Sequence, residues 1–167
     1  YNVQVIQDPD GFSYFTTNYK PPASQLGGPA SSLQDGEGPR PQEFELSIPK
    51  LKIKNAVVKV DNLNFYKSLS HFPGSALPGE VGNGFITGHS VLPQFNDPED
   101  YSAIFTKLAT LEVGDDVYVE ISGETLHFAV LYAKVVNPHD LSVLAPISAN
   151  GRNLTLHEGR AAGALAP

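Results

Sequence analysis

Residues 77–90 read LPGEVGNGFITGHS, and the rest of the chain can be organised around this stretch. Pro78-Gly79 and the GNG run at 82–84 predict turns, because glycine adopts positive φ without steric cost. The run Phe-Ile-Thr at 85–87 predicts a short buried strand. We expect Gly88 to end this strand and to leave His89 in or beside a groove rather than in a sealed core. An imidazole there titrates near neutrality and can act as an acid, a base or a metal ligand. A histidine that only hydrogen-bonds within a turn is the alternative.

Four further segments have recognisable motifs. One precedes residues 77–90, at 44–51 (FELSIPKL), and three follow them, at 105–117, 136–146 and 154–157 (LTLH). Together with residues 77–90 they resemble the sortases, the cysteine transpeptidases of bacterial cell surfaces. The resemblance covers about residues 44–157 and places His89 at the position of the family's catalytic histidine. It implies an all-β fold, a closed or partly open β-barrel with one or two short helices, and in this chain the final strand is absent.

The resemblance also implies a chemistry. A sortase attacks a Leu-Pro-x-Thr-Gly-like sorting signal with a cysteine thiolate and passes the acyl group to an amine on the cell wall or a pilin. The thiolate is favoured by an adjacent imidazolium, and an arginine stabilises the oxyanion. The implied partners are therefore a sorting-signal peptide and an amine acceptor. The implied location is extracytoplasmic, at the cell surface, with a parent protein anchored by an N-terminal transmembrane helix upstream of Tyr1.

The sequence departs from the family at the nucleophile. The family signature Thr-Leu-x-Thr-Cys is replaced by TLHEG (residues 155–159), so Gly159 stands at the nucleophile position. Arg160 is too close to that position to be the family's arginine, and Arg152 precedes the signature, so the oxyanion arginine is absent. Ser90 is a poor substitute nucleophile, because neighbours on a strand point to opposite sides. This chain is therefore expected to be inactive.

Some site residues and one alternative function follow from the same comparison. The candidates for lining a substrate groove beside His89 are Thr87, Ser90, Thr155 and Leu156. A non-catalytic sortase-like binding module (a pseudoenzyme) is the main alternative, and the sequence separates it from the enzyme only near the C-terminus. A secreted all-β domain unrelated to sortases is the third interpretation.

Composition narrows the class of protein. The chain has 167 residues, a formal net charge of -7 and no cysteine. The acidic balance argues against a nucleic-acid partner, and the missing cysteine excludes disulfides and thiolate metal sites. No apolar run approaches the roughly 18 residues of a membrane span. Some sortases bind calcium, but the acidic residues lack EF-hand spacing and the histidines lack metal-ligand spacing, so we expect no cofactor. The acidic residues considered were Asp97, Glu99, Asp100, Asp115 and Asp116.

The pattern along the chain predicts four parts. Residues 1–19 predict a β-hairpin around the turn DPDG, with a partly ordered stalk as the alternative. Residues 20–43 are a Pro/Gly-rich linker. Residues 44–157 form the barrel, with strands at 44–48 and 57–60, a hairpin at 116–136, a short helix at 63–69 and a helical turn through Phe105. Residues 158–167 are an Ala/Gly-rich tail unlike a barrel strand, which we interpret as truncation, frameshift or vector sequence rather than as an evolved pseudoenzyme.

A missing final strand would leave residues 154–157 at an exposed sheet edge, which is a template for strand addition. The segment 1–19 is otherwise unassigned and has strand character. We therefore expect the N-terminal hairpin to cover this seam or groove, in its own molecule or in a neighbour's.

Overall fold

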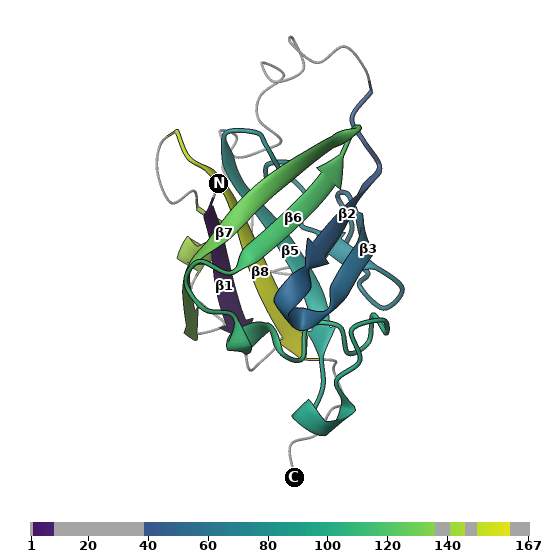
Figure 1. Cartoon of the computed structure of the whole chain (residues 1–167). Helices are drawn as coiled ribbons and strands as arrows, with labels where there is room; N and C mark the ends of the chain where they lie inside the picture. The colour runs from purple at the N-terminus through teal and green to yellow at the C-terminus, as the bar shows by residue number, and fades with distance from the viewer. Residues whose placement is uncertain (1, 9–38, 136–140, 146–149, 161–167) are drawn as a thin grey trace.

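The protein folds into a closed β-barrel in a computed structural model that describes residues 2–8, 39–135, 141–145 and 150–160 (Figure 1). Around the barrel the strands run in the order β1-β7-β6-β2-β3-β4-β5-β8, and β8 pairs with β1 to close it. The strands are β1 (Asn2–Asp8), β2 (Glu43–Ile48), β3 (Ile53–Lys59), β4 (Leu69–His71), β5 (Gly82–Ser90), β6 (Asp116–Ile121), β7 (Glu124–Val135) and β8 (Arg152–Arg160).

The expected all-β barrel is confirmed. Part of its strand pairing is a hairpin formed by β6 and β7. β6 and β7 pair antiparallel through a two-residue turn in which Ser122 and Gly123 both have positive φ, 51° and 81°. Such turns match the twist of the flanking strands. β2 pairs antiparallel with both β3 and β6, whereas β5 and β8 run parallel.

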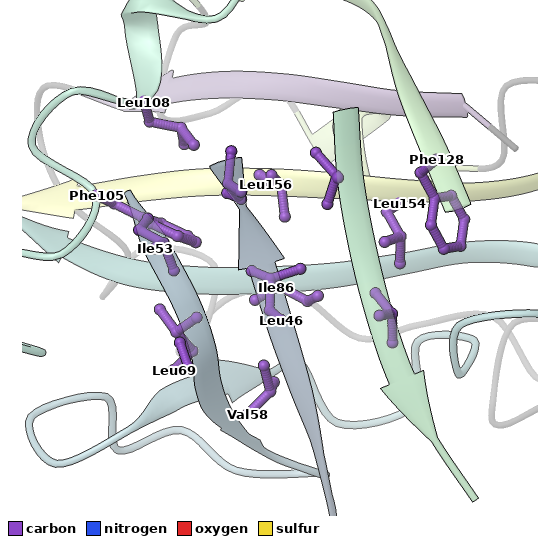
Figure 2. Packing of buried hydrophobic residues seen from close by; sticks show 14 of the residues in the cluster. Leu46, Ile53, Val58, Leu69, Ile86, Phe105, Leu108, Phe128, Leu154 and Leu156 are labelled. Atoms are coloured by element: carbon purple, nitrogen blue, oxygen red, sulfur yellow. The ribbon is translucent and has the colours of Figure 1, made fainter. Parts of the chain in front are cut away.

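Alternate side chains of the strands fill the barrel interior (Figure 2). On β8, Leu154 and Leu156 are fully buried there, and Ile86 of β5 lies beside Leu156 in the strand register. Phe105 and Leu108, which follow β5 in the chain, complete this cluster from one end. The interior is therefore a packed core, and a functional site has to lie on its outer face or rim.

Gly88 does not end the strand as the sequence predicted. β5 runs unbroken from Gly82 to Ser90, so the GNG run also belongs to the strand rather than to a turn. A Cβ atom on Gly88 would lie 2.6 Å from Cδ2 of Leu69 and 2.7 Å from Cδ2 of Phe105. Glycine is therefore needed for packing, because it lets Phe105 approach the strand. Since Gly88 faces the core, alternation places His89 on the outer face of the barrel.

Gly88→Ala is expected to lower the free energy of unfolding by about 1–3 kcal/mol, because the added methyl overpacks a region of buried side chains. Urea denaturation of the variant and the wild type measures the difference. Leu69→Ala vacates the nearest contact, so the double variant should lose less than the sum of the two single losses. A Gly88→Ala protein as stable as the wild type would contradict this account of the packing.

The described part of the chain contains 3₁₀ turns and no α-helix, so the helix expected at 63–69 is wrong. The turns are η2 (Pro49–Leu51), η3 (Pro93–Phe95), η4 (Leu108–Thr110) and η5 (Leu141–Leu144). Asn62 Oδ1 accepts a hydrogen bond from the Asn64 N–H at 3.1 Å, and Asn64 Oδ1 accepts one from the Tyr66 N–H at 3.1 Å. These local side-chain bonds favour turns over a helix.

The helical turn expected through Phe105 is likewise a series of turns, with Asp97 and Asp100 each accepting a bond from the N–H two residues on. Among the described residues no helix has the length and apolarity needed to cross a membrane.

The boundary at the C-terminal end differs from the predicted division, whereas the described N-terminal residues form a strand as predicted. β8 continues to Arg160, so residues 158–160 belong to the barrel and not to the tail. The first half of the expected N-terminal hairpin is a strand, β1, and it lies between β7 and β8 where the seam was expected (Figure 1). The second half of that hairpin, most of the linker and residues 161–167 lie outside the described residues.

Candidate active site

His89 lies on the outer face of β5 under two aromatic rings. The Phe65 ring centroid is 4.1 Å from that of His89, and the Tyr66 ring centroid is 4.4 Å away. His89 is only 2% exposed, whereas Tyr66 is 57% exposed and forms the solvent side of this aromatic cover. His89 is not in the barrel core, and the groove predicted in or beside it stays a prediction. The imidazole is outside the barrel core but enclosed.

Gly159 is the in-register neighbour of His89. β5 and β8 run parallel, and His89 pairs with Gly159, with Thr87 and His157 paired one step earlier on the same face. Adjacent strands lie about 4.8 Å apart, so a side chain at position 159 would lie beside the imidazole. The two positions that the family resemblance assigns to histidine and nucleophile are thus brought together, although 70 residues separate them in the sequence.

The electrostatics of His89 favour the neutral ring. Burial lowers the pKa of His89 below its usual 6.5, and the nearby backbone of Gly159 opposes this only in part. Neither ring nitrogen makes a well-formed hydrogen bond to any described residue. The lowered pKa therefore favours the neutral imidazole under the aromatic cover.

A buried polar layer continues from His89 along the outer face of β5 and β8. Thr155 Oγ1 donates a 2.9 Å hydrogen bond to Asn83 Oδ1, and Asn83 Nδ2 donates a 3.0 Å bond to the Val143 carbonyl. Thr87 Oγ1 lies 3.4 Å from Nδ1 of His157. These side chains are almost fully buried, so this face is covered by other parts of the chain along its length.

The predicted groove residues divide between the two faces of the barrel wall. Thr87 and Thr155 share the outer face with His89. Leu156 belongs to the core cluster, and strand alternation places Ser90 on the inner side with it. Neither can line a surface beside His89.

The sequence analysis missed four residues that contact His89 or the polar layer. The only sequence signal for the cover was the adjacent aromatic pair before β4. The missed residues are Phe65, Tyr66, Asn83 and His157.

The segment that carries the aromatic cover, residues 61–68, is fixed at its start to β4. Asp61 Oδ1 lies 3.5 Å from Nδ1 of His71, and Arg40 Nε donates a 3.2 Å hydrogen bond to Asp61 Oδ2. The Asn62 N–H donates a 3.0 Å bond to the His71 carbonyl, and the Ser70 hydroxyl bonds to the Asn62 carbonyl. The hydrogen bond with His71, followed by the charge of Arg40, lowers the pKa of Asp61 to about 2.

Asp61→Asn is expected to destabilise the fold near neutral pH, because the Asp61 carboxylate is stabilised in the folded state. A carboxyl with a lowered folded pKa contributes stability above its ordinary value of 3.8, and this contribution is lost as the pH falls towards about 2. Urea denaturation at about pH 6 and at about pH 2 should show a stability gap that shrinks in acid. Glu43→Gln is the control, since Glu43 pairs with Lys59 on the surface and exposed pairs contribute little. An equal gap at both pH values would contradict the assignment.

Four of the five acidic residues considered for calcium have structural partners. Asp97 and Asp100 accept turn N–H groups, Asp115 accepts from the Glu112 N–H and from Lys50, and Asp116 lies 2.7 Å from His127. Among the described residues no three histidine or acidic side chains gather as a metal site.

The fold and this site define an all-β barrel with a histidine-centred site on its outer face. The chain belongs to the sortase family, since the family model for the Sortase domain matches residues 46–157. Comparison with curated protein sequences gave no significant match.

Solved sortase structures are similar to this chain over most of its length. Sortase A from Corynebacterium diphtheriae, in a lid mutant, is 30% identical with a TM-score of 0.60, over 87% of this chain and 78% of that one. Sortase C1 from Streptococcus suis is 26% identical with a TM-score of 0.57, over 69% and 62% of the two chains. A Clostridium perfringens sortase D5 transpeptidase, at 20% identity and a TM-score of 0.58 over 75% and 74%, shares the fold.

Proposed function

We propose that this chain is a sortase-type cysteine transpeptidase domain by descent, which recognises a Leu-Pro-x-Thr-Gly-like sorting signal and an amine acceptor. With glycine at the nucleophile position it does not cleave the signal. One observation carries the proposal: Gly159, without a side chain, lies in register with His89 on the adjacent parallel strand. Sortases are in general cell-surface enzymes, and we place this protein at the cell surface, with a membrane-anchored parent.

The proposed chemistry assigns His89 to proton transfer. In the family reaction a thiolate attacks the scissile carbonyl, and the histidine protonates the leaving amine before an acceptor amine attacks the thioester. This chain has the histidine at position 89, but no thiolate can form, because no cysteine occurs in the sequence. Binding of the signal peptide without bond cleavage is therefore the expected activity.

The wild-type chain is expected to give no transpeptidation product from a quenched Leu-Pro-x-Thr-Gly peptide with triglycine as the acceptor. Gly159→Cys supplies a thiol beside His89, so it is expected to form a thioacyl adduct detectable by intact-mass spectrometry. Its turnover should remain slow, since a missing oxyanion donor typically costs ~10²–10³ in rate.

Gly159→Ser and the double variant Gly159→Cys/His89→Ala are the matched controls. The serine lacks a thiolate, and the double variant lacks the proton donor. Wild-type product that depends on His89 would overturn the proposal, and so would a Gly159→Cys protein that forms no adduct with the peptide.

A non-catalytic sortase-like binding module is the second candidate, and the same glycine supports it. The two candidates differ in the response to Gly159→Cys. A transpeptidase scaffold forms the adduct, whereas a dedicated binding module binds the fluorescent peptide without forming one. Fluorescence anisotropy with the wild type and mass spectrometry with the variant separate them.

A further inference from the structure

The N-terminal strand β1 lies between β7 and β8 and runs parallel to both (Figure 1). On one side, residues 2–7 pair with residues 129–135 of β7. On the other side, residues 2–8 pair with residues 153–159 of β8 in continuous register. We call the space between these two edges the strand slot.

Removing β1 from the strand slot would be unfavourable, because backbone groups on both sides of the slot would lose their partners. Without β1, the facing N–H and C=O groups of β7 and β8 would be exposed at two sheet edges. Unpaired edges are costly when buried and act as templates for strand addition when exposed. The fit rests on backbone pairing and on an alternating sequence, NVQVIQD, in which Val3 and Val5 lie in register with the buried Leu154 and Leu156. The β1 strand of a second copy has the same sequence and can therefore make the same pairing.

β1 can be released from the barrel without breaking any antiparallel pairing. It is held by parallel ladders on both sides, and parallel pairing is slightly less stable per residue than antiparallel pairing. The connection to β2, residues 9–42, has a contour length of roughly 100 Å at ~3.3 Å per residue, which is enough to reach a neighbouring molecule.

From these features we propose that the strand slot accepts the β1 strand of a second copy, so that two copies exchange their N-terminal strands reciprocally. Each barrel in the dimer keeps the same ladders as in the single chain. The balance between the two forms then depends on protein concentration against the effective concentration of the tethered strand, on the order of 1 mM for a flexible linker. This proposal concerns assembly and does not depend on the proposed function.

The absence of cysteine from the chain allows a direct test by disulfide cross-linking. In the register, Val5 pairs with Ala133 and Asn2 pairs with Ala129. Single-cysteine proteins, for example Val5→Cys and Ala133→Cys, are mixed at increasing concentration, equilibrated, oxidised mildly and separated on a non-reducing gel. A cross-link between these two proteins requires the strand of one copy to lie in the slot of the other. Asn2→Cys with Ala129→Cys is the second matched pair.

The mismatched pairs Val5→Cys with Ala129→Cys and Asn2→Cys with Ala133→Cys are the controls. The matched pairs should give about tenfold more heterodimer than the mismatched pairs, with a yield that rises with concentration towards the effective concentration. The double variant Val5→Cys/Ala133→Cys reports the intramolecular form at low concentration.

Each outcome decides the proposal. Matched heterodimers support the exchange. Cross-linking only within the double variant shows that the slot takes its own strand alone and overturns the proposal. Equal yields from matched and mismatched pairs, or none from any protein, overturn the parallel register and the slot itself.

Discussion

Replacing Phe65 and Tyr66 with alanine is expected to raise the rate of His89 modification by diethyl pyrocarbonate by at least about tenfold, since the reagent needs a local opening in the wild type. The two rings lie 4.1 and 4.4 Å from the imidazole and leave His89 only 2% exposed. The unprotonated ring nitrogen is the reactive atom, and the lowered His89 pKa favours that form, so we expect access to limit the reaction. Peptide mapping by mass spectrometry gives the rate at each histidine.

The other histidines provide internal references for this measurement. His127 is exposed beside Asp116 and should react at the same rate in both proteins. His71 and His157 are fully buried and should stay protected as long as the barrel remains folded. A rise at all buried histidines would indicate general unfolding rather than removal of the cover. An unchanged rate at His89 would show that Phe65 and Tyr66 do not control access to it.

The same variant should also change the titration of His89. Burial lowers the His89 pKa, so the unfolded state binds more protons as the pH falls below about 6.5, and the wild type loses stability there. Removing the cover restores solvent to the ring and should raise the His89 pKa towards its usual value. Histidine titration by NMR should show this rise, and the acid loss of stability should become smaller.

The residues of the candidate site could be predicted in part from the sequence. The family resemblance implied that His89 and position 159 belong to one site. Their pairing on β5 and β8 was not predicted, because residues 158–167 were expected to form a tail rather than a strand. The barrel followed from the same resemblance. The faces of individual residues were less certain: Gly88 is a packing position, and that depends on Phe105, which is distant in sequence.

The aromatic cover could not be predicted from local pattern. The local pattern at residues 63–69 predicted a helix, whereas Asn62 and Asn64 form turns through their own side chains. The position of this segment is set by Asp61 and its long-range partners instead. Tertiary contacts of this kind leave no periodic signal in a single sequence.

Deletion of residues 1–8 is expected to lower the stability of the barrel strongly, because it removes the strand that pairs with both β7 and β8. Each net hydrogen bond contributes about 0.5–1.5 kcal/mol, so losing both ladders should cost several kcal/mol, a large part of the roughly 5–15 kcal/mol that stabilises a small domain. We expect a fall in Tm of more than about 10 °C and a tendency to associate through the exposed edges. Differential scanning calorimetry and light scattering measure the two effects.

Two matched variants separate ladder pairing from mere chain length. Val5→Pro keeps every other residue but removes one backbone N–H and restricts φ within β1, so it should reproduce much of the loss. Val5→Thr keeps the β propensity and the N–H, so its loss should be much smaller. Adding a synthetic peptide of residues 1–8 to the truncated chain should restore part of the Tm, whereas the same peptide with Val5→Pro should not. If truncation leaves both Tm and oligomeric state unchanged, β1 does not close the barrel. The pairing of β1 with β8 would then contribute no stability, and the edge formed by residues 153–159 would have to be stabilised in another way.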